Sequence, residues 1–313
     1  MPPEGPAARD ALPAFTSTDA SVLAGLPFLA LVSRLVPAGN WPAVARTLSP
    51  LAVGDLAPSP KAAAAAIRQT LGAHRPELTG HDVLKGMAAE GILTFLQVLR
   101  SYPGGRWTPR VRALNFERVD AGLARGRGVV LWVAHGFHGH LSAKIAFRKA
   151  GLQVTHLSHP SHGFSASRFG IRYLNRLQTR VEDPFIAERV LLPVGGQNTA
   201  LNVLARRLRA NGVVSITGQR GTGRTVAAPF LAGEIRLAPG APAMAQMTGA
   251  ALLPVFAFRG EDNVIDVAVE PAIEIQADRP RDEAVGMAVR SYARMLEDYV
   301  LRYPKQWLGW VQL

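Results

Sequence analysis

A run of six apolar residues at positions 129–134 places the strongest constraint on the fold of this chain. It is preceded by Gly126-Arg-Gly128 and followed by the polar, glycine-containing segment that begins at His135. An apolar run of this length with such flanks is typical of a buried strand that ends in a polar turn at the rim of a sheet. From residue 129 onward, short apolar runs alternate with helical segments, and this alternation indicates an α/β fold.

The same patterns locate the other elements. We predict further strands at 153–157, 190–194, 213–217, 226–230, 252–258 and 265–269. Helices are expected between them at 141–150, 165–177, 198–211, 241–248 and 282–302. Residues 21–100 have helical periodicity, most clearly at 61–71 and 81–100. The predicted fold is a mixed, mostly parallel central sheet flanked by helices, with an N-terminal helical layer.

The domain organisation is predicted from the proline-rich N-terminus and from the order of the predicted helices and strands. Residues 1–20 are rich in proline and are expected to be disordered, and residues 21–313 are expected to form a single domain. Within it we assign 21–115 to the helical layer and 116–313 to the α/β core. The apolar segment 22–33 stops at Arg34, short of the ~20 residues needed to cross a bilayer. It fits either a buried helix or an interfacial helix that dips into one leaflet.

Composition limits the partners. The 313 residues are 48% hydrophobic, enough for a large core, and carry a formal net charge of +12. This charge favours an anionic partner: a membrane surface, a phosphorylated substrate, an acidic carrier protein or nucleic acid. The basic residues are spread along the chain without a nucleic-acid-binding motif, so we expect no nucleic-acid partner. The absence of cysteine excludes disulfides and thiolate zinc sites.

Six of the eight histidines lie between His135 and His162. Imidazole transfers protons near neutral pH and is also a common metal ligand, so His135, His138 and His140 suggest either acid–base catalysis or a metal-dependent hydrolase. The segment 135–140 contains no carboxylate, and the remaining clustered histidines fall on another predicted element. We therefore expect no metal and no other cofactor, and keep the hydrolase as an alternative.

Six segments of the second half carry a family resemblance. They are GRGVVLWVAHGF at 126–137, VSITGQRG at 214–221, APFLA at 228–232, LAPGAP at 237–242, TGAALLPVF at 248–256 and YPKQWLGW at 303–310. In this order and spacing, which covers roughly residues 60–310, the sequence resembles the lauroyl/myristoyl acyltransferases of lipid A biosynthesis, within the lysophospholipid acyltransferase superfamily.

The resemblance implies a glycerolipid acyltransferase-like fold and a peripheral protein at the cytoplasmic face of the inner membrane. It implies transfer of a fatty acyl chain from acyl carrier protein or acyl-CoA to a hydroxyl or amine of a lipid or lipopeptide-like acceptor. His135 takes the place of the family's general base. The side chains expected to contact substrate are Arg168, Arg172, Gln219, Arg220 and His138.

The sequence departs from the family pattern at His140, where the family has an acidic residue five positions after the base. A neutral histidine can orient the base but cannot neutralise the imidazolium, and losing the orienting carboxylate of a serine protease costs about 10⁴ in rate. Three hypotheses follow. His135 and His140 form a weak catalytic pair, a distant carboxylate such as Glu182 or Asp183 reaches the site, or the protein binds acyl carrier or lipid without transfer.

Overall fold

The central feature of the computed structural model is a seven-stranded sheet with the order β1-β9-β8-β2-β5-β3-β4. The structure describes residues 12–57, 59–102, 107–192, 197–218, 224–276 and 278–312. All neighbouring strands pair in parallel except β8 and β9. The strands are β1 (Val111–Leu114), β2 (Val129–Ala134), β3 (Val154–Ser158), β4 (Glu188–Leu191), β5 (Val213–Gly218), β8 (Ala251–Arg259) and β9 (Ile265–Val269). The prediction of a mixed, mostly parallel sheet is confirmed.

Helices cover both faces of this sheet. Alternate residues of β2 pack into two different cores, with Val130 and Trp132 in one and Val129 and Leu131 in the other. A strand at the centre of such a sheet is buried on both faces, and this explains why all six residues of β2 are apolar. The first core is closed by α9 (Gln197–Arg209), α10 (Gly240–Thr248) and α11 (Arg281–Arg302), and the second by α6 (Glu117–Leu123) and α7 (Leu141–Lys149).

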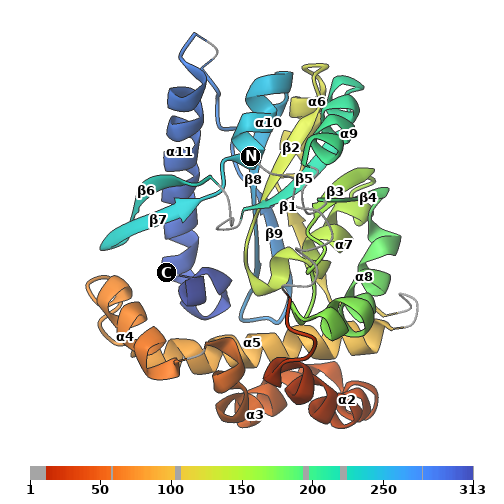
Figure 1. Cartoon of the computed structure of the whole chain (residues 1–313), viewed down its shortest axis with the longest axis vertical. Helices are drawn as coiled ribbons and strands as arrows, with labels where there is room; N and C mark the ends of the chain where they lie inside the picture. Colours follow the sequence, from red (N-terminus) through yellow and green to blue (C-terminus); the bar gives the residue numbers. More distant parts are fainter. Residues whose placement is uncertain are drawn as a thin grey trace.

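The N-terminal helices form a layer along one end of the sheet (Figure 1). They are α2 (Ser17–Leu35), α3 (Trp41–Leu56), α4 (Pro60–Leu71) and α5 (Gly80–Ser101). Helix α5 is the longest of them and lies across the lower end of the sheet in this view, with α2 and α3 on its outer side. A capping box between Thr79 and Asp82 satisfies backbone groups at the start of α5. The predicted helical layer is therefore present.

Two smaller parts complete the fold beside α11. The antiparallel hairpin of β6 (Val226–Phe230) and β7 (Gly233–Leu237) packs against α11, and the chain ends in the short helical turns Pro304–Gln306 and Leu308–Gln312. The Gln306 side chain pairs with both backbone groups of Arg259, accepting from N at 2.8 Å and donating to O at 2.9 Å. The Leu308 amide donates to the His135 carbonyl at 3.3 Å. These bonds hold the C-terminal turns against the ends of β8 and β2.

Most predicted elements agree with the structure within a few residues, and β2, β6 and β9 have the predicted bounds. The sequence analysis missed three short elements: β1, β7 and α6. Because β1 belongs to the sheet, the sheet begins at Val111 and not after residue 115. The strand predicted at 190–194 is β4, which begins at Glu188, and residues 193 and 194 lie outside the described residues.

Two boundary predictions were wrong. The helix predicted at 165–177 starts three residues later and continues to the end of α8 (Asn175–Glu182), with the wider π-helical turn Gly170–Leu174 inside it. Helix α2 begins at Ser17, inside the segment expected to be disordered, because Thr16 and Asp19 form a capping box at its start. Residues 1–11 lie outside the described residues.

Candidate active site

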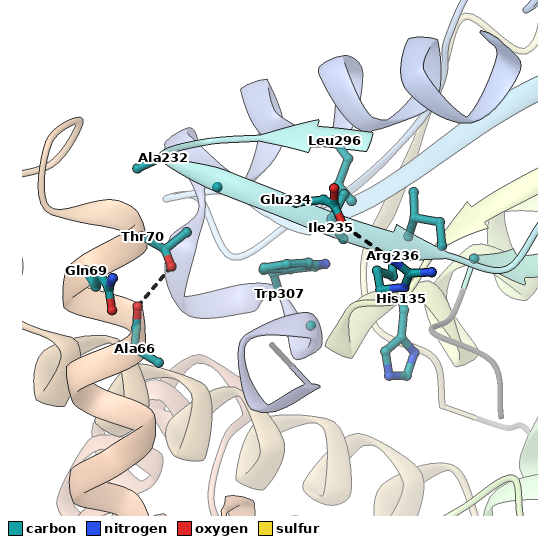
Figure 2. A pocket seen from close by; sticks show the side chains of 14 residues that line it. Ala66, Gln69, Thr70, His135, Ala232, Glu234, Ile235, Arg236, Leu296 and Trp307 are labelled. Atoms are coloured by element: carbon teal, nitrogen blue, oxygen red, sulfur yellow. Dashed lines mark hydrogen bonds and ion pairs between the residues drawn. The ribbon is translucent and has the colours of Figure 1, made fainter. Parts of the chain in front are cut away.

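His135 follows the last residue of β2 and lines a cleft of about 360 Å³. Figure 2 shows helix α4 on one side of this cleft, the β6–β7 hairpin on another, and Trp307 of the C-terminal segment between them. The lining residues are Ala66, Gln69, Thr70, His135, Gly218, Ala232, Gly233, Glu234, Ile235, Arg236, Leu237, Leu296, Trp307 and Gly309. The turn predicted to carry the chemistry therefore opens into a cleft large enough for part of a small-molecule substrate.

The cleft has an apolar wall and a polar rim. Leu296 and Trp307 belong to the apolar wall, whereas Glu234 and Arg236 on β7 contribute charge. Arg236 is the one cationic side chain among the described residues that line the cleft. Its contact with Glu234 is long, at 3.5 Å, and both side chains are about half exposed. Such an exposed pair is weak, so Arg236 remains able to bind an anionic group.

The imidazole of His135 is set to accept a proton. Burial, with a smaller contribution from the nearby His162, lowers the pKa of His135 to about 4. The side chain is therefore neutral at neutral pH, which is the form that acts as a general base. It remains partly accessible, because His135 lies at the end of the strand and not in its buried middle.

His140 lies beside His135, as the family motif predicts for the second position of the pair. The turn Phe137–Gly139 brings the two rings to a centroid distance of 5.7 Å, and His140 is the N-cap residue of α7. Burial lowers the pKa of His140 well below its usual range, with further contributions from His162 and His135. Its Nδ1 atom is buried and has no hydrogen-bond partner among the described residues.

A buried carboxylate lies beyond His140, at the end of α8. The His162 ring is 5.0 Å from that of His140, and its Nε2 atom is 2.9 Å from Oε2 of Glu182. Glu182 also accepts a hydrogen bond from Gln178 at 2.9 Å. It forms ion pairs with Lys144 at 3.1 Å and with Arg189 at 3.0 Å. It is fully buried.

The partners of Glu182 decide its charge. Burial raises the pKa of this carboxyl. The interactions with Lys144, His162 and Arg189 lower it by more, so the pKa lies well below the usual range. Asp183, the other carboxylate considered from the sequence, is half exposed and pairs with Arg189 at 2.7 Å. Of the two, Glu182 is therefore the one that reaches the histidines, and it contacts His162.

His138 belongs to a different cluster. Its Nε2 atom is 3.1 Å from Oε2 of Glu90 on α5, and Glu90 also pairs with Arg259 at the end of β8. His138 is 1% exposed and is not among the residues that line the cleft. The contact joins the His135 turn to the helical layer, so the structure gives His138 a place in the scaffold behind the turn.

Two of the predicted substrate arginines, both within the described residues, do not line the cleft. Arg168 and Arg172 are both exposed and neither lines the cleft, and the guanidinium of Arg172 lies 5.5 Å from the Tyr173 ring. Gln219 and Arg220 lie outside the described residues, and Gly218 immediately before them lines the cleft. Sequence analysis missed Arg236, although the alternation of Ile235 and Leu237 with polar residues is a strand signal that would have placed it on an exposed face.

The described histidines also do not converge as metal ligands. Among the described residues, no group of three or more His, Asp or Glu side chains is arranged to hold a metal ion. His138 is directed to Glu90, and Nδ1 of His156 pairs with Ser215 Oγ at 2.8 Å. The row from His135 through His140 to His162 is instead suited to orienting a base for proton transfer.

We expect acid to destabilise the protein from about pH 6.5 downward. The pKa values of His135, His140 and His156 are lowered in the folded state, with burial as the main cause. Below about pH 6.5 the unfolded chain therefore binds more protons than the folded one, and stability falls by up to about 1.4 kcal/mol per pH unit for each histidine. Urea unfolding at pH 7.5 and 5.5 measures this. A His156→Gln variant should show a shallower dependence, and equal stability at both values would contradict the expectation.

The sequence comparisons agree with this geometry. The family model described as bacterial lipid A biosynthesis acyltransferase matches residues 89–312. This match covers more than half of the chain, including the whole sheet, His135 and the cleft-lining hairpin. No curated protein matches the sequence. The chain belongs to the bacterial lipid A biosynthesis acyltransferase family.

Proposed function

We propose that this protein transfers a fatty acyl chain from a thioester of acyl carrier protein or coenzyme A to a hydroxyl group of a lipid acceptor, with His135 as general base. The observation that carries the proposal is the position of a neutral imidazole at the end of β2, where it lines a cleft with an apolar wall and, among the described residues, one cation. Membership of an acyltransferase family supports the reaction class.

The chemistry requires one proton acceptor. The acceptor oxygen attacks the thioester carbonyl carbon while His135 takes the hydroxyl proton. The carbon–sulfur bond then breaks, an ester remains, and the protonated imidazole returns the proton to the leaving thiolate. Arg236 is placed to hold an anionic group of the donor or the acceptor. The net charge of +12 favours an acidic carrier protein as donor.

The direct test uses purified protein, acyl-carrier and acyl-CoA thioesters of several chain lengths, and a panel of hydroxyl-bearing and amine-bearing lipids. Mass spectrometry should detect an acceptor heavier by one acyl group, together with free thiol. The His135→Ala variant is the matched control. Thioester consumption equal in wild type and variant, with no acylated product, would contradict the proposal.

A binding role without turnover is the second candidate, and the presence of His140 in place of the acidic residue favours it. The same assay separates the two. A carrier-binding relative would retain acyl-carrier protein with wild-type affinity in the His135→Ala variant and would acylate no acceptor in either form.

We further propose that the protein works as a peripheral protein on the cytoplasmic face of the inner membrane. Helix α2 is long and apolar enough to cross a membrane by length and composition. However, Val32 packs with Leu93 and Leu96 of α5, whereas Phe28, Leu31 and Leu35 of the same helix are exposed. A helix with one face on the protein and an apolar face in solvent favours lying in the membrane interface.

The exposed face of α2 should determine binding to lipid. Leu31 and Leu35 are 57% and 71% exposed, and burying each in lipid contributes roughly 1.5–3 kcal/mol. Leu31→Glu combined with Leu35→Glu should therefore weaken binding to anionic vesicles by at least about tenfold, measured by vesicle sedimentation. The control is Met247→Glu, because Met247 is 48% exposed on a helix outside the N-terminal layer. Equal binding by all forms would show that another surface holds the membrane.

A further inference from the structure

The structure joins His135 to the buried Glu182 through two intervening histidines that come from separate elements. His135 follows β2, His140 precedes α7 as its N-cap, His162 lies in the loop after β3, and Glu182 ends α8. The ring centroids of His135 and His140 are 5.7 Å apart and those of His140 and His162 are 5.0 Å apart. The row ends in a 2.9 Å hydrogen bond to the carboxylate.

We infer that His162, held by Glu182, is a positioning residue that orients His140 and, through it, the base His135. This inference rests on the proposed function, and it identifies the group that replaces the acidic residue at position 140. In this role His162 and Glu182 act on His135 through His140.

The hydrogen bond to Glu182 fixes the His162 ring at the end of the row of histidines. Glu182 is ionised and can only accept, so Nε2 of His162 carries the proton that it donates at 2.9 Å. His140 is the ring next to His162, and the Nδ1 atom of His140 is buried without a hydrogen-bond partner among the described residues. The His162 ring, fixed by Glu182, packs against the His140 ring at a centroid distance of 5.0 Å and so restricts the orientation of His140.

The contribution of Glu182 is orientation and not charge. Its carboxylate already pairs with Lys144 at 3.1 Å and with Arg189 at 3.0 Å, so two cations neutralise its field before it reaches His135. Gln178 donates to the same carboxylate at 2.9 Å and fixes its plane. The other ring that faces His162 is His156, at a centroid distance of 6.4 Å, and its Nδ1 atom is occupied by Ser215.

The first test compares His162→Ala with His156→Ala, a change of the same size at a neighbouring buried histidine. We expect His162→Ala to lower kcat about 10- to 100-fold and to change KM by no more than about twofold. The loss in rate should be smaller than the ~10⁴-fold loss seen when a serine protease loses its orienting carboxylate, because the variant only misorients the base. Millimolar imidazole should restore part of the rate by filling the vacated space. His156→Ala should keep kcat within about threefold and show no rescue. Equal losses in the two variants, or no rescue of His162→Ala, would overturn the inference.

The second test places a carboxylate directly beside the base. In a His140→Glu background the new side chain can orient His135 without the row, so adding His162→Ala should cost less than about threefold in kcat. A loss equal to that of the single His162→Ala variant would show that His162 does not act through position 140, and would overturn the inference.

The third readout needs no turnover and separates the inference from the proposed function. Nitrogen-15 NMR of the histidine rings should show Nε2-protonated His162 and a single tautomer of His135 in the wild type, and mixed tautomers of His135 in His162→Ala. If this holds while the wild type transfers no acyl chain, the proposed reaction fails and the positioning role stands. Unchanged His135 signals in His162→Ala would overturn the positioning role even in an active enzyme.

Discussion

Replacing His135 by alanine is expected to lower kcat/KM for acyl transfer by about 10²- to 10⁴-fold, the usual contribution of a general base. The expectation follows from the position of the imidazole, which lines the cleft and is neutral at neutral pH because burial lowers its pKa to about 4. Steady-state assays with a thioester donor measure the loss, and product must be identified by mass spectrometry.

The fold of the His135→Ala variant should be preserved. His135 follows the last residue of β2 at the cleft, and its backbone carbonyl, which accepts from Leu308, is retained in the variant. Circular dichroism and vesicle binding should therefore match the wild type. Thr70→Ala, which changes another cleft-lining side chain, is a suitable control and should keep kcat within about threefold. Wild-type turnover in His135→Ala would remove the basis of the proposed mechanism.

The activity should also depend on pH in a defined direction. The base is active when neutral, and the folded-state pKa of His135 of about 4 is below the ordinary value for histidine. The acidic limb of the kcat/KM profile should therefore appear as a loss of rate when the pH falls toward 4, well below the value near 6.5 that an exposed histidine would give.

The centre of the fold could be predicted because it is encoded locally. The six apolar residues of β2 are buried on both faces, and the patterns of β6 and β9 also stand out between glycine, asparagine and polar residues. The missed strand β1 has only four residues, two of them exposed, and Arg112 pairs with Asp266 at 2.7 Å across 154 positions of sequence. Its strand conformation depends on pairing with β9, which no local pattern reveals.

The parts of the site that are close in sequence could likewise be predicted, and the parts that depend on the fold could not. His135 and His140 are five positions apart and share one turn, so the sequence placed them together. Glu182 was one of two carboxylates considered, but only the path of α8 decides that Glu182 is buried while Asp183 is half exposed. Arg168 and Arg172 were predicted to contact substrate but do not line the cleft. Helical spacing alone does not reveal which face of a helix points toward a cleft.

Removing the Glu182 carboxylate should have the largest effect on stability. Glu182→Met leaves Lys144, which is 2% exposed, without its ion-pair partner, whereas Arg189 keeps Asp183. Breaking a buried pair from one side typically costs about 3–5 kcal/mol, because a charge is left uncompensated. We therefore expect urea unfolding at neutral pH to report a loss of this size for Glu182→Met.

The double variant Lys144→Met with Glu182→Met is the matched control for the buried charge. It removes both partners and replaces them with apolar side chains of similar length, so it should be more stable than Glu182→Met alone. The pH dependence gives a further check. In Glu182→Met the folded-state pKa of Lys144 remains lowered by burial, so the unfolded chain binds more protons and stability should rise with pH toward the unfolded-state value near 10.4. A double variant no more stable than the single one would show that packing, and not an unpaired lysine, sets the cost of losing Glu182.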